Sequence, residues 1–229
     1  MSGELIDTSQ MYLRTVYELE EADIEPKRAR IVDRLHQAGP TVSQTVARME
    51  RDGLMRLTEE RTIELTRSGF DEARKVMRHH RLAECFLIDV LGLDYDKAHD
   101  EACRWEHVMS EEVTERMAER LGHPTASPYG APIPTATARK VRRLADYGQD
   151  LRSAVAAGLD RVVFVMVDER PQTDSDFMAQ LAASQIRPGD VVVLGGQGDD
   201  FALASEDGQR TVSIPREYAG SIRVKSAHH

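Results

Sequence analysis

The tripeptide Ala38-Gly39-Pro40 should interrupt helical structure, and this break between helices constrains the fold more than any other local feature of the sequence. Residues 7–21 and 26–35 precede the break and residues 41–51 follow it, and each segment carries apolar side chains at helical spacing. Two amphipathic helices, a tight turn and a third helix predict a helix-turn-helix. The side chains expected to face its core are Tyr12, Val16, Leu19, Ala29, Val32, Leu35, Val42, Val46 and Met49.

The third predicted helix is followed by a wing and has a polar face suited to DNA. Gly53 stands at the C′ position that ends this helix, and strands are expected at residues 54–57 and 62–65. Hydroxyl groups at a helix N-terminus bind phosphate, a glutamine amide pairs with adenine, and a proline can contact a thymine methyl group. We therefore expect a winged helix-turn-helix that binds double-stranded DNA. The candidate contacts are Arg28, Pro40, Thr41, Ser43, Gln44, Arg48, Arg51 and Arg61.

The distribution of charge allows DNA binding even though the net charge of the chain is −9. Between residues 26 and 57, seven basic side chains stand against three acidic ones. The acidic surplus lies elsewhere, notably in residues 18–25 and 94–119. A basic region in an acidic protein favours regulated rather than indiscriminate DNA binding.

Potential metal ligands follow one face of a helix expected at residues 96–121, and two more lie at i,i+4 on a helix expected at residues 71–91. Thiolate, imidazole and carboxylate groups together form a donor set that is softer than magnesium or calcium prefers. The sequence therefore predicts a transition-metal centre. The candidates are His80, Glu84, His99, Cys103, Glu106 and His107.

Helix geometry divides these ligands between two sites. His99 lies roughly 10–12 Å along a helix from Glu106 and His107, which is too far to share one ion when metal–ligand bonds are about 2.0–2.3 Å. One site is expected on Cys103, Glu106 and His107 with one more ligand from elsewhere. The other is expected on His99 with the imidazole and carboxylate of the preceding helix. Neither a nucleophile motif nor a Gly-rich phosphate loop accompanies these sites, so no enzyme is predicted.

The rest of the sequence indicates two further units. The helices expected at residues 71–91 and 96–121 offer more apolar surface than one small domain needs, which is typical of a dimerisation module. Four prolines in residues 124–134 indicate a linker or a tethered extended segment. Several short strands near the C-terminus, with a hairpin signal at Asp207-Gly208, predict an SH3-like barrel.

We therefore expect a mainly α-helical protein with a small β domain. Residues 1–73 should form the winged helix-turn-helix DNA-binding domain. Residues 74–140 should form a helical dimerisation and metal-binding domain with a proline-rich tail, and residues 141–229 a linker and the SH3-like domain. The strands of that domain are expected at residues 161–167, 191–194, 201–205, 209–214 and 221–225.

The composition predicts a soluble, cytoplasmic protein without a membrane partner. No apolar run approaches the length of a membrane span, and the N-terminus lacks the features of a signal peptide. Cys85 and Cys103 are the two cysteines and should be free thiols in a reducing compartment. No function is assigned to His228 and His229.

Several stretches of the sequence resemble the iron-dependent repressors of the diphtheria toxin repressor family. They are Asp7-Thr8 with residues 11–15, residues 39–53, residues 76–78 with 80–84, and residues 99–110. The resemblance implies a primary, activating site on Met11, Cys103, Glu106 and His107, and an ancillary site on His80, Glu84 and His99, completed by two polar residues for which Asp174 and Asp176 are the best candidates. It also implies that Arg81 and Ser127 contact an anion. The asparagine that contacts this anion in the family is replaced by Ala131 here. A serine that the family has at the start of the DNA-reading helix is replaced by Ala38.

The resemblance implies a repressor that binds palindromic operators as a homodimer, with one or two dimers on each operator, when it is loaded with two Fe(II) ions per subunit. Its targets would be iron-uptake and iron-homeostasis genes. Co(II), Ni(II), Zn(II) or Mn(II) should substitute in vitro. A manganese-responsive regulator on the same scaffold is the first alternative, and a metal-binding protein without a regulatory role is the second. The sulfur donors Met11 and Cys103 favour iron over manganese.

Overall fold

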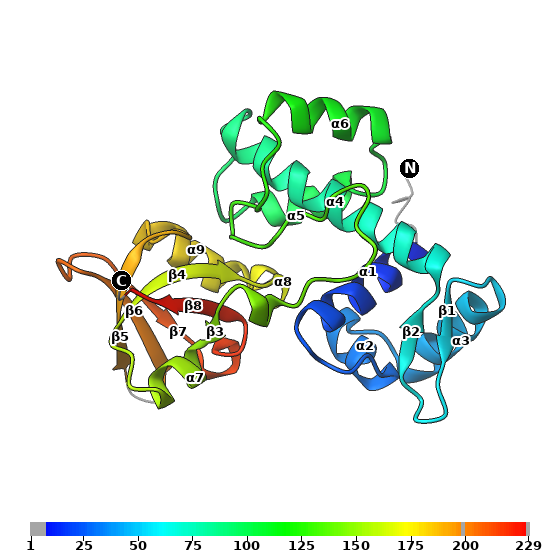
Figure 1. The fold of residues 1–229 in the computed structure, drawn as a ribbon, viewed down its shortest axis with the longest axis horizontal. Helices are drawn as coiled ribbons and strands as arrows, with labels where there is room; N and C mark the ends of the chain where they lie inside the picture. Colours follow the sequence, from blue (N-terminus) through cyan, green and yellow to red (C-terminus); the bar gives the residue numbers. More distant parts are fainter. Residues whose placement is uncertain (1–7, 198–199, 228–229) are drawn as a thin grey trace.

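The apolar side chains of residues 11–65 build most of the first of three structural units (Figure 1). In the computed structural model, which describes residues 8–197 and 200–227, Val42, Val46 and Met49 are fully buried in the core of this unit. Gly53 has a φ of +72° and ends the third helix, as expected for a C′ glycine. The winged helix-turn-helix is thus confirmed. Its elements are α1 (Thr8–Glu21), α2 (Arg28–Leu35), α3 (Gly39–Arg51), β1 (Met55–Leu57) and β2 (Ile63–Leu65).

The second helix buries a different side chain from the one expected. Ile31 is fully buried, with Val32 and Leu35 partly buried beside it, whereas Ala29 is exposed. Ala29 stands two residues from Ile31, roughly 200° around an α-helix, so the two side chains point to opposite faces. The expectation of Ala29 in the core was wrong. Asp7, expected to cap α1 together with Thr8, lies outside the described residues.

A single helix, α4 (Arg67–Asp89), connects the first unit to the second. The Thr66 hydroxyl caps it by accepting the backbone N–H of Gly69, and a Cβ atom at Gly69 would lie only 1.8 Å from the Leu54 carbonyl oxygen. Phe70 and Met77 pack into the first core, and the second half of α4 packs into the helical unit. The domain boundary expected at residues 73 and 74 therefore falls inside a continuous helix.

The helix expected over residues 96–121 is two helices, so that expectation was wrong. α5 (Ala98–Trp105) ends before Glu106, and α6 (Glu111–Arg120) begins after Ser110. The Ser110 hydroxyl accepts the backbone N–H of Val113, and two glutamates follow in the first turn. A serine cap with acidic residues after it stabilises a helix N-terminus, which explains the new start.

The proline-rich segment is tethered to the C-terminal unit. Tyr129 is fully buried in the C-terminal core, its hydroxyl donates to the Tyr95 carbonyl oxygen at 2.7 Å, and its own carbonyl oxygen accepts from the Val167 N–H at 2.9 Å. Gly130 has a φ of +87°, and a Cβ atom there would lie 2.1 Å from the Val165 carbonyl oxygen. The segment therefore holds the β domain against the helical unit.

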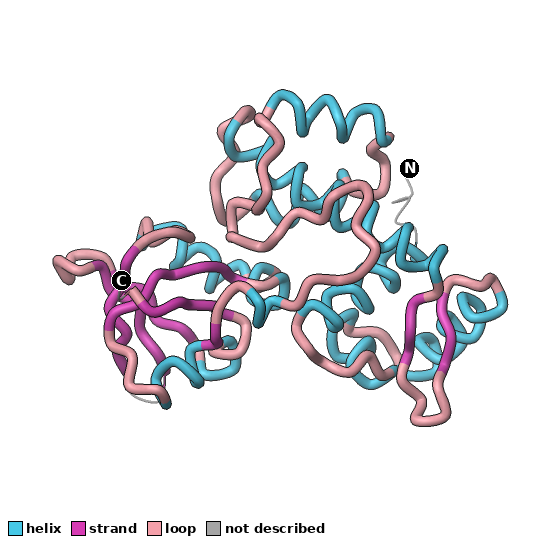
Figure 2. The backbone as a smooth tube through the Cα atoms, in the orientation of Figure 1, coloured by secondary structure: helices cyan, strands magenta, loops and turns pink. Residues whose placement is uncertain are grey.

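The C-terminal unit is an antiparallel sheet in the strand order β3-β8-β4-β5-β6-β7, so the small β domain is confirmed (Figure 2). Gly208, with a φ of +68°, lies in the turn between β6 and β7, where the hairpin was expected. Short helices not expected from the sequence also belong to this unit. Its elements are η1 (Leu144–Asp146), β3 (Gln149–Asp150), α7 (Leu151–Ala156), β4 (Arg161–Val167), α8 (Glu169–Gln172), α9 (Ser175–Ser184), β5 (Val191–Gln197), β6 (Asp200–Ser205), β7 (Thr211–Ile214), η2 (Arg216–Tyr218) and β8 (Ile222–Ser226).

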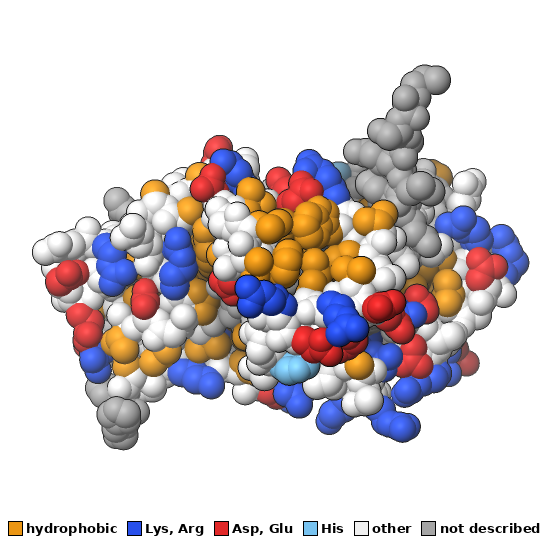
Figure 3. All heavy atoms as spheres, turned by 90° about the horizontal axis from the view of Figure 1, so that it is seen from above, with side chains coloured by type: hydrophobic (Ala, Val, Ile, Leu, Met, Phe, Trp, Pro, Cys, Tyr) orange, Lys and Arg blue, Asp and Glu red, His pale blue; other side chains and the backbone are white. Residues whose placement is uncertain are grey.

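The surface of the helical unit carries apolar side chains. Seen from above, hydrophobic side chains gather near the middle of the molecule (Figure 3). Val90, Leu91, Val108 and Val113, at the ends of α4, α5 and α6, are between 40% and 71% exposed. Among the described residues, no helix is both long and apolar enough to cross a membrane. His228 and His229 lie outside the described residues.

Candidate metal centre and DNA-reading surface

Helices α4 and α5 bring two histidines and a carboxylate together at the centre of the molecule. His80 and Glu84 share one face of α4, and His80 Nε2 lies 2.7 Å from Glu84 Oε1. His99, on α5, places Nδ1 3.2 Å from the same oxygen of Glu84. The two imidazole rings are 4.9 Å apart, edge to face, and all three side chains are 98–100% buried. The three residues expected in the ancillary group therefore converge.

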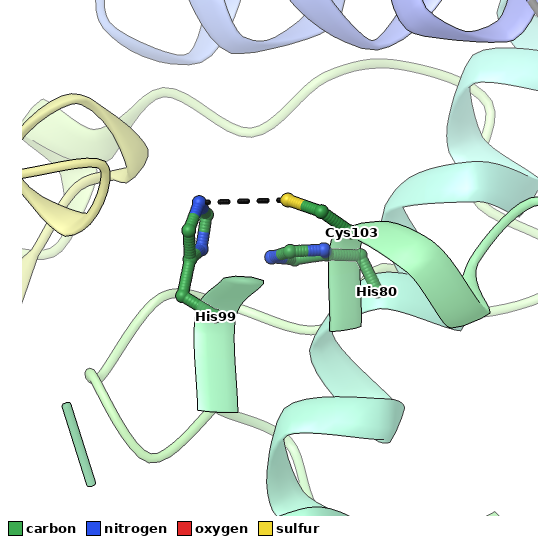
Figure 4. Close-up of side chains that lie close together, drawn as sticks. All are labelled: His80, His99 and Cys103. Atoms are coloured by element: carbon green, nitrogen blue, oxygen red, sulfur yellow. Dashed lines mark hydrogen bonds between the residues drawn. The ribbon is translucent and has the colours of Figure 1, made fainter. Parts of the chain in front are cut away.

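Cys103 joins this group from the next turn of α5. Its Sγ lies 3.6 Å from His99 Nε2, and Figure 4 shows the thiol and the His80 and His99 rings around one common space. One donor atom from each of these three residues lies within 4.8 Å of the others. The sequence places His99 and Cys103 on one helix face at i,i+4, but we expected them to bind different ions; in the structure their donor atoms are in contact.

Glu169 is the donor that the sequence did not reveal. It is the first residue of α8, separated from strand β4 by the cap residue Asp168, and its Oε2 lies 3.4 Å from His80 Nε2 and 3.6 Å from His99 Nδ1. Donor atoms of Glu169, His80, Glu84 and His99 all lie within 4.8 Å of one another, and all four residues are buried. The available signal was the acidic pair Asp168-Glu169 after an apolar strand, because the end of a strand can place a side chain against a neighbouring domain.

Asp174 and Asp176, expected to complete the ancillary group, are not part of this cluster. Asp174 caps α9: its Oδ1 accepts the backbone N–H groups of Asp176 and Phe177, and its Oδ2 accepts the Tyr218 hydroxyl. Asp176 is exposed in the first turn of the same helix. Helix capping thus accounts for Asp174, and the carboxylate near His80 and His99 is that of Glu169.

The second predicted group lies around the end of α5. Glu106 is the C-terminal cap residue of this helix, and its Oε1 lies 3.3 Å from His107 Nε2. His107 Nδ1 lies 2.8 Å from Gln10 Oε1 on α1, next to Met11, which is partly buried against the core of the first unit. The three elements α1, α5 and the residues after α5 therefore meet at this point.

His80 links the two groups. Its Nδ1 lies 2.6 Å from Glu106 Oε2, and its Nε2 faces Glu84 on the other side. The groups are therefore parts of one buried polar network, although helix spacing alone suggested two separate clusters.

Arg14 of α1 lies in the middle of this network. Its Nη1 donates to Glu106 Oε2 at 2.7 Å and to Cys103 Sγ at 3.2 Å, and its Nη2 donates to Glu169 Oε2 at 3.3 Å. The side chain of Arg14 is 10% exposed. One guanidinium thus connects the DNA-binding unit to donors of the helical and the C-terminal unit.

Opposite charges keep the acidic donors ionised despite their burial. Burial opposes ionisation of Cys103, but Arg14 and His99 hold the pKa of its thiol well below the usual value. Burial likewise raises the pKa of Glu106, but Arg14 and His80 outweigh it and bring that pKa down to about 2. Anionic sulfur and oxygen are the forms that bind a metal ion.

Arg81 and Ser127, expected to contact an anion, already have partners within the chain. Arg81 donates to both carboxylate oxygens of Glu21, at 2.9 and 2.7 Å, to Glu169 Oε1 at 3.0 and 3.1 Å, and to the Pro132 carbonyl oxygen at 2.6 Å. The Ser127 hydroxyl accepts the backbone N–H of Tyr129. Arg81 is therefore already paired with two carboxylates of the protein.

The first turn of α3 presents its polar side chains to the outside. Of the predicted contacts, Pro40, Thr41, Gln44, Arg48, Arg51 and Arg61 are exposed, and Arg28 and Ser43 are partly exposed. Across the part of the chain that the structure describes, Arg28, Arg48, Arg51 and Arg61 form no ion pair, and the first turn of α3 has no acidic residue. This face can therefore receive phosphate groups.

Comparisons with known proteins agree with both parts of this description. Residues 4–63 match the family described as "Iron dependent repressor, N-terminal DNA binding domain", and residues 66–135 match "Iron dependent repressor, metal binding and dimerisation domain". A manganese-dependent transcriptional repressor in complex with manganese has a similar structure, with a TM-score of 0.79 and 25% identity over 96% of this chain and 100% of that one.

Two curated relatives align along almost the entire chain. The iron-dependent repressor IdeR of Mycobacterium leprae is 43% identical over 234 residues, which cover 97% of this chain and 99% of the relative. The diphtheria toxin repressor of Corynebacterium efficiens is 48% identical over 233 residues, which cover 97% and 96%. The chain therefore belongs to the family of iron-dependent repressors, with a DNA-binding domain and a metal-binding and dimerisation domain.

Proposed function

We propose that this protein is a transcriptional repressor that binds operator DNA as a homodimer when it is loaded with Fe(II). The observation that carries the proposal is the buried donor cluster of His80, Glu84, His99 and Glu169, with Cys103 beside it. Its members come from helices of two units, and Arg14 and Gln10 extend the network to α1 of the DNA-binding unit. Occupancy of this centre would therefore bear on the position of the DNA-reading helix.

The residues of the cluster fit a divalent cation. Glu84 Oε2 is buried and has no hydrogen-bond partner among the described residues, which is costly for an ionised carboxylate. A cation between Glu84 and Glu169 would satisfy that oxygen and reduce the repulsion of two buried carboxylates. We assign His80, Glu84, His99 and Glu169 to an ancillary ion.

A second, activating ion would bind Cys103, Glu106 and His107, with Met11 as the ligand from α1. Two ions per subunit follow from these two assignments. When bound, an ion supplies positive charge that draws donors of different units together. Arg48 and the other exposed arginines around α3 would then meet operator phosphates in a defined register.

Dimerisation supplies the second DNA-reading helix. The exposed apolar side chains Val90, Leu91, Val108 and Val113 lie in the region that matches the dimerisation domain of the family. Two recognition helices must match half-sites about 34–36 Å apart, or a multiple of that distance. An ion that binds the correctly spaced arrangement better than the others raises the DNA affinity by mass action. One or two such dimers would occupy each operator.

Iron is favoured by sulfur, because the thiolate of Cys103 and the thioether of Met11 suit Fe(II) better than Mn(II). Co(II), Ni(II), Zn(II) and Mn(II) should substitute in vitro by their intrinsic affinities. The genes controlled would be those of iron uptake and iron homeostasis. A manganese-responsive regulator is the second candidate, because the cluster of His80, Glu84, His99 and Glu169 contains nitrogen and oxygen donors alone.

The test is anaerobic fluorescence anisotropy on a labelled operator of the iron-repressor type, with chelator, with Fe(II), and with Fe(II) followed by chelator. We expect DNA binding with iron alone, reversed by chelation. The variant Arg48→Ala should bind iron normally and bind DNA more weakly on every sequence. Loss of one phosphate contact should reduce the slope of log affinity against log salt concentration by about one. Equal DNA affinity with chelator and with iron would refute metal-dependent repression.

A further inference from the structure

The guanidinium of Arg14 stands among the same atoms that are proposed to hold the activating metal. It lies 2.7 Å from Glu106 Oε2 and 3.2 Å from Cys103 Sγ, and both atoms approach the same nitrogen, Nη1. On its other side, Nη2 lies 3.3 Å from Glu169 Oε2 and 3.5 Å from His80 Nε2. No other arginine or lysine among the described residues contacts Cys103 or Glu106.

The contacts of Arg14 neutralise a concentration of buried negative charge. Cys103, Glu106 and Glu169 each place an anionic donor within 3.3 Å of the same buried guanidinium. Buried charges of one sign repel strongly unless a cation compensates them. Arg14 supplies that cation from within the chain, with a planar group whose N–H donors reach several acceptors together.

We propose that Arg14 is a built-in counter-cation, which holds the activating donors together in the metal-free protein and competes with the metal for Cys103 and Glu106. The metal must displace the guanidinium from these atoms before it can bind them. Arg14 therefore raises the metal concentration at which the protein responds. This inference rests on the proposed function, because it concerns regulation of the same site.

Glu18 provides a second carboxylate to which the displaced guanidinium can bind. Arg14 Nε already donates to Glu18 Oε1 at 2.7 Å, one turn along α1 and away from the metal donors. Glu18 Oε2 in turn lies 3.5 Å from Nη1 of Arg34, on α2 of the helix-turn-helix. Exchange of Arg14 from Cys103 and Glu106 toward Glu18 thus provides a contiguous route from the metal centre to the DNA-binding unit.

The test compares Arg14→Met, which keeps the apolar stem and removes the charge, with wild type and Arg34→Met. Arg34 shares Glu18 with Arg14 but contacts none of the metal donors, so it is the matched control. The anaerobic affinity for Co(II) is measured by competition with a chromogenic chelator, and the melting temperature is measured with and without the ion. Arg14→Gln, which keeps amide donors without the charge, replaces Arg14→Met should that variant not fold.

We expect Arg14→Met to bind Co(II) roughly tenfold more tightly than wild type. Its metal-free form should melt roughly 5–15 °C lower, and saturating Co(II) should abolish most of that difference. Arg34→Met should leave the Co(II) affinity unchanged. An unchanged or weaker affinity in Arg14→Met, with normal binding by wild type, would overturn the role of Arg14 alone. Absence of Co(II) binding by wild type would overturn both this inference and the proposed function.

Discussion

Replacing Glu169 by glutamine tests the part of the metal centre that comes from the C-terminal unit. The carboxylate of Glu169 accepts two N–H groups of Arg81, at 3.1 and 3.0 Å, and one of Arg14, at 3.3 Å, and lies 3.4 Å from His80. Glu169→Gln keeps the shape and one acceptor oxygen but removes the negative charge. Arg81, Arg14 and His80 then lose a shared buried anion.

The contacts that remain set the size of the effect. Breaking a buried ion pair by removing one partner costs about 3–5 kcal/mol. Arg81 keeps both oxygens of Glu21, and Arg14 keeps Glu106 and Glu18, so we expect the lower end, about 3 kcal/mol. At about 2–4 °C per kcal/mol for a chain of this size, the metal-free protein should melt about 6–12 °C lower.

The same substitution should weaken metal binding by roughly 10–100-fold. The assays are thermal denaturation followed by circular dichroism and anaerobic calorimetric titration with Co(II). Asp176→Asn is the matched control, because Asp176 is exposed and outside the cluster. Asp174→Asn should cost little, because an asparagine keeps the oxygen that caps α9. Normal metal binding by Glu169→Gln, together with loss of an ion in Asp174→Asn or Asp176→Asn, would refute the assignment of Glu169.

Three further predictions concern other parts of the molecule. The stabilisation from ionised Glu106, whose pKa falls from 4.5 to about 2, is fully present above pH 4.5 and is lost as the pH falls toward 2; acid denaturation of Glu106→Gln should lack this component. Gly69→Ala should destabilise the protein by about 1–3 kcal/mol or more in urea denaturation, because its Cβ would lie 1.8 Å from the Leu54 carbonyl oxygen. Alkylation of Cys103 should abolish Co(II) binding at the activating site in calorimetry, whereas Cys85→Ala should bind Co(II) as wild type does, because the Cys85 thiol packs with Leu82 and contacts the Ala126 carbonyl oxygen.

Elements with a strong local signal could be predicted from the sequence. Helix α3 has two valines and a methionine at helical spacing and a glycine after its end. The three apolar side chains are buried and the glycine follows the last turn, as expected. Ser110 shows where local reasoning failed: the apolar period continues past it, but its hydroxyl starts a new helix. Ala29 was misplaced because a helix as short as α2 does not define its buried face from spacing alone.

Several residues of the buried donor cluster could be singled out from the sequence, but their arrangement could not. His80, Glu84, His99 and Cys103 stand at helical spacing, so pairs of them could be recognised within each helix. The contact of His80 with Glu106, by contrast, depends on how α4 packs against the end of α5. The contacts of Glu169 depend on the docking of the C-terminal unit against the helices, which sequence periodicity cannot predict.

The position of Arg14 could not be predicted from the sequence for the same reason. In the sequence it is one more charged residue on an amphipathic helix, and its neighbour Glu18 at i,i+4 suggests an ordinary surface ion pair. Its burial among Cys103, Glu106 and Glu169 follows from the meeting of three units. Long-range contacts of this kind leave no local signal in the sequence.

The most direct test of the account is an anaerobic DNA-binding titration with Fe(II) and with Mn(II) at fixed salt, on wild type, Cys103→Ala and Cys85→Ala. The account predicts half-maximal operator binding at clearly lower free Fe(II) than Mn(II). This response should be retained in Cys85→Ala and lost in Cys103→Ala. An equal or better response to Mn(II) would identify a manganese regulator. DNA binding that persists in Cys103→Ala with unchanged metal dependence would contradict the activating role of this thiolate.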